Sequence, residues 1–295
     1  MKIGLVFEGG GGRGAYEIGV WKALNELGID KLISCVSGTS VGALNSILFL
    51  QGDYNVAEEV WLSLTMDKIV PVDNRELTMK GFALFMGNKN LNFIKKLSPK
   101  LLKEGKISRE GLLQIIDKYI DFKKVIESEI SCYATCTEFP ELKARYFKIN
   151  EHDEESIRDI LLATSALPMF YESTEVETKK YMDGGIVDNL PIQPIYGEAC
   201  DIIIVVHLSD EIVVDKSLYP NTDIIEIIPT HNQGGVLDGI LDFTTEGAKR
   251  RILDGYEDTI NMVRPIFNIH KYMMQREENG LGIKIGKIFN ALKYK

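Results

Sequence analysis

A serine set between two glycines constrains the fold of this chain more than any other short stretch. The pentapeptide Gly38-Thr39-Ser40-Val41-Gly42 follows the apolar run Leu32–Val36 and opens a helical-looking stretch, Val41–Leu50. This G-x-S-x-G pattern is typical of the sharp strand-to-helix turn that carries the nucleophile of serine hydrolases. Small neighbours let the backbone pack closely there, and helix amides favour negative charge at the hydroxyl. The pattern predicts Ser40 as a nucleophile and Gly38 and Gly42 as its turn, against the alternative of an inert serine in a tight turn.

Strand and helix signals alternate along the first fifty residues. Lys2–Phe7 and Leu32–Val36 are predicted strands, and Gly14–Leu27 and Val41–Leu50 are predicted helices. This alternation sets successive strands parallel and covers both faces of the sheet with helices. Two later β-branched runs have the composition of strands buried in a parallel sheet: Ile202–His207 and Asp223–Ile228. We therefore expect an α/β fold, a three-layer sandwich with a central, mostly parallel sheet.

Two other stretches are predicted to be helical. Residues 55–122 lack strand signals and are expected to form a helical insertion or cap, and residues 236–295 a helical C-terminal extension. The insertion holds a bulky apolar cluster, which is either core or a mobile cover over an apolar pocket: Phe82, Leu84, Phe85 and Met86. Because the chain shows no repeat, low-complexity linker or clear boundary, residues 1–295 are expected to form one domain.

Composition argues against several classes of function. The net charge is −9 and the sequence pI is about 5.1, whereas a nucleic acid partner needs a basic surface. Apolar runs are too short to span a bilayer, and the N-terminus lacks the pattern of a secretory signal. The scattered cysteines are expected to be buried free thiols in a reducing cytoplasm, since only half a zinc site is present: Cys35, Cys132, Cys136 and Cys200. We expect a cytoplasmic protein without a transmembrane segment.

A second glycine cluster follows the first predicted strand, at Glu8-Gly9-Gly10-Gly11-Gly12-Arg13-Gly14. Its spacing matches the dinucleotide-binding fingerprint, but the acidic residue that such a fold needs after its second strand is missing. A P-loop is unsupported because no Gly-Lys-Ser/Thr follows. Glycine amides at a helix N-terminus also bind a transient oxyanion. Since adjacent parallel strands end at one edge of the sheet, we expect this loop to lie beside Ser40.

A nucleophilic serine also needs a proton acceptor, and histidine is the usual one. Of the four histidines, only His207, at the end of a predicted strand, is well placed for a Ser-His-Asp triad. A buried carboxylate also serves where a dry site raises its basicity. Asp183-Gly184-Gly185 ends an extended stretch, and its glycines let the turn approach another loop, although Asp-Gly pairs are usually plain turns. From the residues alone, His207 and Asp183 are both candidates.

Together the three glycine motifs resemble those of the patatin-like phospholipase family. That family combines a glycine-rich loop with Arg or Lys before its last glycine, a serine elbow, and a late Asp-Gly-Gly or Asp-Gly-Ala. The matching segments here are Gly9–Gly14, Gly38–Gly42 and Asp183–Gly185. The block Ala163–Phe170 is similar to the one that precedes the family's aspartate, and the resemblance covers about Lys2 to Pro194.

The resemblance implies a serine lipid acyl hydrolase that needs no metal or organic cofactor. It implies Ser40 as nucleophile, Asp183 as general base with Gly184 and Gly185 forming its turn, and an oxyanion hole from the Gly9–Gly14 amides, oriented by Arg13. The implied partner is a lipid ester at a membrane or micelle surface: a phospholipid, lysophospholipid or glyceride. The Phe82–Met86 cluster and the basic tail, Lys284–Lys295, are either interfacial elements or core and solvated surface.

Three alternative functions are also consistent with this sequence. An acyltransferase shares the fold and oxyanion hole, although malonyl-type transferases usually carry histidine at the place of Thr39. A non-catalytic lipid-binding protein keeps the pocket without the chemistry. A conventional esterase uses His207 as its base.

Overall fold

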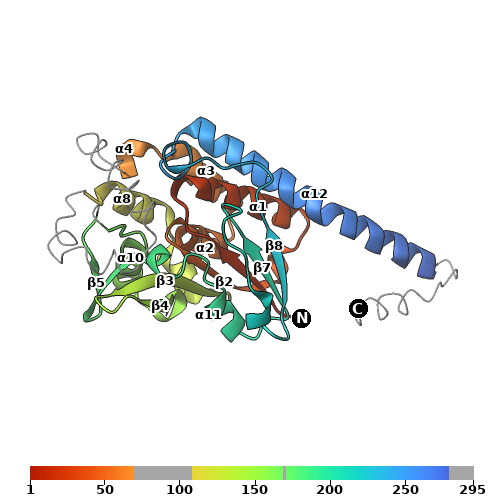
Figure 1. The fold of residues 1–295 in the computed structure, drawn as a ribbon, viewed down its shortest axis with the longest axis horizontal. Coiled ribbons are helices and arrows are strands. Elements are labelled where there is room, and N and C mark those ends of the chain that lie inside the picture. The colour runs from red at the N-terminus through yellow and green to blue at the C-terminus, as the bar shows by residue number, and fades with distance from the viewer. Residues whose placement is uncertain (70–107, 169–170, 279–295) are drawn as a thin grey trace.

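The computed structural model describes residues 1–69, 108–168 and 171–278 (Figure 1). Its centre is a mixed sheet in the order β5-β6-β3-β2-β1-β7-β8, with β4 also paired to β3. Strands β3, β2, β1, β7 and β8 run parallel, whereas β4 and β6 pair antiparallel with β3, and β5 pairs antiparallel with β6. The strand bounds are β1 Ile3–Phe7, β2 Ile33–Thr39, β3 Ser131–Phe139, β4 Lys143–Lys148, β5 Thr174–Val176, β6 Lys179–Asp183, β7 Ile202–Val206 and β8 Asp223–Ile227.

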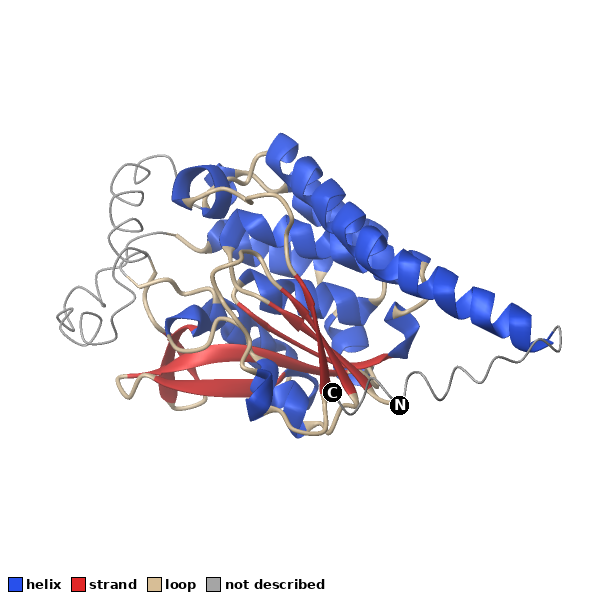
Figure 2. Ribbon diagram, turned by 45° about the vertical axis from the view of Figure 1, so that its right-hand side comes forward, coloured by secondary structure: helices blue, strands red, loops and turns tan. Residues whose placement is uncertain are grey.

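Helices cover both faces of this sheet, which confirms the predicted three-layer α/β fold (Figure 2). Side chains of α1, α2 and α10 share one large apolar core with one face, and α11 packs against the other face at β1, β2 and β7. Residues of a strand alternate between the two cores, as Leu5 and Val6 do. The helix bounds are α1 Ala15–Glu26, α2 Val41–Gln51, α3 Tyr54–Ser63, α4 Met66–Ile69, α8 Glu110–Tyr119, α9 Phe122–Glu127, α10 Glu154–Thr164, α11 Ile192–Gly197 and α12 Thr245–Glu278.

The predicted helical stretches are only partly visible. Within 55–122 the structure describes α3, α4, α8 and the start of α9, whereas the Phe82–Met86 cluster lies outside the described residues. The C-terminal extension includes one long helix, α12, and the basic tail Lys284–Lys295 again lies outside the described part. All four cysteines are buried and unbridged, as predicted. None of the helices in the described ranges has the length and apolar character needed to cross a bilayer.

Helix α12 lies directly on α1 and then extends past the body of the molecule (Figure 1). The two helices cross closely because a glycine of each helix faces the backbone of the other. A Cβ on Gly19 of α1 would lie 2.0 Å from the carbonyl oxygen of Ile252, and one on Gly255 of α12 would lie 2.1 Å from that of Tyr16. Only glycine fits at either position without moving the helices apart.

Candidate active site

Strand register brings the three predicted motifs to one level of the sheet. Phe7 of β1 pairs with Gly38 of β2, so the glycine-rich loop and the Ser40 turn leave neighbouring strands together. Thr39 pairs with Thr135 of β3. The next residue of β3, Cys136, pairs with Asp183 at the end of β6. Residues far apart in the chain therefore meet at one edge of the sheet.

Ser40 occupies a strained turn between β2 and α2. Its φ is 54° and its ψ is −121°, a backbone conformation that non-glycine residues rarely adopt. A Cβ on Gly38 would lie 2.1 Å from the backbone of Gly42, and one on Gly42 would lie 2.7 Å from carbonyl oxygens at the end of β1. Both positions therefore require glycine because backbone approaches from the other side.

Thr164 at the end of α10 holds this turn. Its Oγ1 atom accepts a 2.9 Å hydrogen bond from the Ser40 amide and donates a 2.5 Å bond to the carbonyl of Thr135. The Ser40 amide is thereby occupied, and the turn is linked to β3. Sequence reasoning did not single out Thr164, although it lies in the Ala163–Phe170 block, of which Met169 and Phe170 are outside the described residues.

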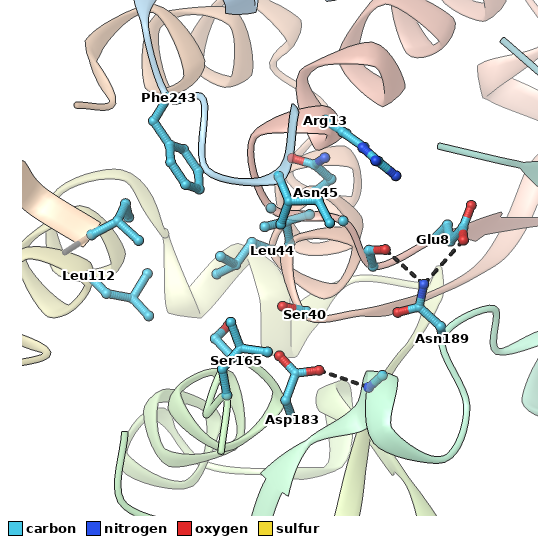
Figure 3. Close-up of a pocket in the computed structure, with 18 of the residues that line it drawn as sticks. Glu8, Arg13, Ser40, Leu44, Asn45, Leu112, Ser165, Asp183, Asn189 and Phe243 are labelled. Atoms are coloured by element: carbon cyan, nitrogen blue, oxygen red, sulfur yellow. Dashed lines mark hydrogen bonds between the residues drawn. The ribbon is translucent and has the colours of Figure 1, made fainter. Parts of the chain in front are cut away.

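Asp183 is 2% exposed and its carboxylate faces the Ser40 side chain (Figure 3). The Gly185 amide donates a 2.8 Å hydrogen bond to Oδ1, whereas Oδ2 has no partner of hydrogen-bond geometry among the described residues. Burial raises the pKa of Asp183 to about 7, and the Gly185 amide and the nearby Ser40 hydroxyl oppose part of that rise. The hydroxyl is thus close enough to affect the pKa without a formed bond to Oδ2, which is common before substrate binds. Asp183 is a buried carboxylate with one oxygen left unpartnered on the side of Ser40.

The glycine-rich loop lies on the opposite side of Ser40. Gly9, Gly10 and Gly11 line the same cavity as Ser40 and Asp183, whereas Gly12 and Gly14 are buried behind them. The Gly9 amide donates to the carbonyl of Asn189 at 3.1 Å. The loop then forms a 3₁₀ turn over Gly11–Gly14, and the first amides of such a turn have no acceptor within it. Gly10 and Gly11 thus line the cavity at the start of this turn.

A segment beyond residue 230, which sequence reasoning did not connect with the site, encloses this loop. A Cβ on Gly11 or Gly12 would lie 2.2 Å from the carbonyl oxygens of Ile240 and Asp242, respectively. The Arg13 guanidinium donates to the carbonyl of Gly234. Arg13 therefore ties the loop to the 234–242 segment.

Arg251 of α12 holds the same segment in place. This fully buried guanidinium donates to the Asp238 carbonyl at 2.8 Å and forms a 2.9 Å ion pair with the Asp242 carboxylate. A buried, multiply bonded arginine is a rigid support because its planar donors fix direction as well as distance. Residues of the C-terminal extension therefore pack against one side of the glycine-rich loop.

Asn189 links the glycine-rich loop to the Asp-Gly-Gly turn, and sequence reasoning missed it. Its amide nitrogen donates to the Gly9 carbonyl at 2.8 Å and to Glu8 Oε1 at 3.1 Å. The buried Glu8 carboxylate also accepts the Leu208 amide at 2.6 Å through Oε2. A Cβ on Gly185 would lie 2.7 Å from Asn189 Oδ1, so the two loops are in close contact. The only sequence signal was the position of Asn189, shortly after Asp183.

Ser40 and Asp183 lie at the polar end of a cavity of about 460 Å³. The remaining wall is mostly aliphatic and aromatic, and Phe243 stacks on Trp61 there. Its apolar lining residues include Leu44, Leu48, Val60, Trp61, Leu64, Leu112, Ile115, Ile116, Ile120 and Phe243. A cavity with one polar end and a long apolar wall fits an ester that carries a hydrocarbon chain.

His207 is not brought to this cavity. It is fully buried at the end of β7, and its Nε2 atom lies 3.2 Å from Glu226 Oε2 on β8. Burial lowers its pKa, although Glu226 opposes the change. Nor do three His, Cys, Asp or Glu side chains gather into a metal-binding group anywhere in the described ranges.

The sequence profile of the patatin-like phospholipase family matches residues 5–196. "Lysophospholipase nte1" of Aspergillus terreus is 27% identical over 204 residues, 69% of this chain but 12% of its own length. Uncharacterized NTE family proteins of Mycobacterium bovis and Mycobacterium tuberculosis are 26% identical over 208 residues, 70% of this chain and 49% of theirs. The chain thus spans half or less of these relatives.

A solved structure shares the fold. The crystal structure of VipD from Legionella pneumophila aligns with 89% of this chain and 66% of its own, with a TM-score of 0.51 and 15% sequence identity.

Proposed function

We propose that this chain, which belongs to the patatin-like phospholipase family, is a serine lipid acyl hydrolase that works through a Ser40–Asp183 dyad. The observation that carries the proposal is the position of Ser40 beside the buried Asp183 carboxylate, in a cavity whose remaining wall is mostly apolar. The Asp183 pKa of about 7 supports it, since a base near neutral pH both accepts and returns a proton readily. The lysophospholipase name of the fungal relative supports a lipid ester as substrate.

Acylation begins with proton transfer from the Ser40 hydroxyl to the free Asp183 Oδ2. The Ser40 oxygen then attacks the ester carbonyl, and the Gly10 and Gly11 amides stabilise the oxyanion of the tetrahedral intermediate. The intermediate collapses as the C–O bond to the alcohol breaks, and Asp183 returns its proton to that alcohol. The acyl group is left on Ser40 with its chain along the apolar wall.

Water completes the reaction. Asp183 accepts a proton from a water molecule while the water oxygen attacks the acyl carbonyl carbon. The second tetrahedral intermediate then collapses and releases the fatty acid. Ser40 regains its proton from Asp183. No step requires a metal or an organic cofactor.

The direct test compares wild type with Ser40→Ala on a lipid panel with mass-spectrometric product detection. Wild type is expected to release fatty acid from lysophospholipid, phospholipid or glyceride, and the variant to fall to the uncatalysed background. A fluorophosphonate probe should label wild type and leave Ser40→Ala unlabelled. A folded Ser40→Ala protein with full activity would overturn the proposal.

A further inference from the structure

Three consecutive residues at the end of α10 connect both members of the dyad. Thr164 accepts the Ser40 amide through Oγ1 at 2.9 Å, and the carbonyl of Ala166 accepts the Asp183 amide at 3.0 Å. Ser165 lies between these two anchors and lines the cavity. Its position relative to Ser40 and Asp183 is therefore fixed from both sides.

The Ser165 hydroxyl has no visible structural role. Its Oγ atom is buried and has no hydrogen-bond partner among the described residues. The same is true of Asp183 Oδ2, and both atoms belong to residues that line the cavity. Figure 3 shows the Ser40, Ser165 and Asp183 side chains converging on the same part of that cavity.

Ser165 Oγ and Asp183 Oδ2 are thus two buried, unpartnered oxygens on residues that line the same cavity. Leaving a buried polar atom unpaired costs about 1–3 kcal/mol, and a water molecule with two or more polar partners removes that cost. A water that donates one hydrogen to Asp183 Oδ2 and the other to Ser165 Oγ has its lone pairs free.

We propose that Ser165 positions the hydrolytic water, a role that rests on the proposed Ser40–Asp183 chemistry. The water oxygen forms a bond to the acyl carbonyl carbon while one of its protons passes to Asp183. Ser165 Oγ accepts the hydrogen bond from the other proton and so sets the direction of attack. The bond from the carbonyl carbon to Ser40 then breaks, the proton on Asp183 passes to Ser40, and the fatty acid leaves.

Ser165 acts in only one of the two halves of the reaction. Acylation uses the Ser40 hydroxyl, Asp183 and the glycine-rich loop, whereas Ser165 acts only when water is the nucleophile. Removing the Ser165 hydroxyl should therefore slow deacylation and leave acylation nearly unchanged. The acyl-enzyme should accumulate, and added alcohol should divert more of the acyl group into transfer, because alcohol does not depend on the same water site.

The experiment follows wild type, Ser165→Ala and Ser165→Thr with a p-nitrophenyl ester. Stopped-flow release of p-nitrophenol gives the acylation rate, and intact-mass spectrometry after substrate removal gives the decay of the acyl-Ser40 adduct. We expect Ser165→Ala to acylate within about two-fold of wild type and to deacylate about ten-fold more slowly, the loss of about 1.4 kcal/mol of transition-state stabilisation. Ser165→Thr retains a hydroxyl and should restore deacylation.

The outcomes distinguish this inference from the proposed function. If wild type forms no adduct at Ser40, both fail. If the adduct forms but decays at the wild-type rate in Ser165→Ala, only the water-positioning role is overturned. Equal losses in acylation and deacylation, with no rescue by threonine, also overturn it, because a structural role predicts that pattern. Should Ser165→Ala not fold, as judged by circular dichroism, Ser165→Gly removes the same hydroxyl and is measured in its place.

Discussion

Two buried carboxyl groups lie close to the glycine-rich loop and face different surroundings. Asp183 lines the cavity and directs its unpartnered Oδ2 towards Ser40. Glu17 of α1 is 0% exposed, does not line the cavity, and accepts a 2.7 Å hydrogen bond from Asn45 through Oε2. Its Oε1 atom is also unpartnered within the described residues, and burial raises its pKa well above the usual carboxyl value.

By burial and pKa alone, the two groups are alike. The difference is that Asp183 borders a space that a substrate can enter, while Glu17 supports Asn45, whose Oδ1 atom accepts the Trp61 indole N–H at 2.9 Å. A perturbed carboxyl is therefore a marker of function only together with a cavity and a reaction partner. Glu17 is a matched internal control for Asp183.

The largest expected effect comes from Asp183→Asn, which keeps the side-chain shape and removes the base. Hydrolysis of a p-nitrophenyl ester should fall by about 10³-fold or more, since amide nitrogen cannot accept the Ser40 proton. A folded variant with activity within ten-fold of wild type would break the comparison, because Asp183 would then be as dispensable as Glu17.

The same substitution should raise stability at alkaline pH. The folded-state pKa of about 7 lies above the ordinary value of 3.8, so the unfolded chain gives up this proton more readily. The protonated Asp183 carboxyl therefore stabilises the folded protein fully below about pH 4. This contribution declines by about 4 kcal/mol in all as the pH rises to about 7. Urea unfolding at pH 4 and pH 8 should show Asp183→Asn gaining on wild type only at the higher pH.

A smaller effect is expected from pH on wild-type activity. Only ionised Asp183 accepts the Ser40 proton, so kcat/KM should rise about ten-fold per pH unit up to about pH 7 and then level. A pH–rate profile from pH 5 to 9 measures this. The profile of Glu17→Gln should show the same inflection, and a flat wild-type profile below pH 7 would contradict the assignment of the base.

Glu17→Gln should change stability more than activity. The amide retains an oxygen that accepts the Asn45 hydrogen bond, so kcat/KM is expected within about three-fold of wild type. Because the raised pKa of Glu17 makes wild type lose stability as the pH rises above the usual carboxyl range, the variant should be the more stable protein at pH 8. A 100-fold loss of activity with an intact fold would place Glu17 in the chemistry.

The smallest effect on activity is expected from His207→Ala. The imidazole lies outside the cavity lining and interacts with Glu226, so kcat/KM should stay within about two-fold of wild type. Some loss of thermal stability is expected because the substitution leaves a cavity in the core. A loss of activity comparable to that of Asp183→Asn would restore the Ser-His-Asp interpretation.

Sequence predicted the parts of this molecule that depend on local spacing. Strands β1 and β2, the helix after Ser40 and the glycine-rich turn were expected because apolar runs and glycines adjoin one another in the chain. The helical stretch 55–122 was expected because strand signals are missing there. Strand β5, elsewhere in the chain, has only three residues and is too short to leave a pattern.

The supports of the site could not be predicted in the same way. The residues joined by the Arg13–Gly234 hydrogen bond are 221 positions apart, and those joined by Asn189 and Gly9 are 180 apart. Neither pair carries a recognisable spacing, because the contacts exist only once the sheet is assembled. Thr164 and Ser165 were noticed as part of a block, yet their separate contacts depend on where α10 ends.

The close contact between the glycine-rich loop and residues 234–242 has a practical consequence for dissecting this protein. The recognisable family sequence ends at residue 196, but the Ile240 and Asp242 carbonyls and Arg251 that confine Gly11 and Gly12 lie beyond it. A fragment trimmed to the recognisable sequence would keep the proposed nucleophile and base and lose the backbone that packs against Gly11 and Gly12. Boundaries drawn from sequence similarity alone therefore separate the glycine-rich loop from the 234–242 segment and from Arg251 at the start of α12, which hold it in place.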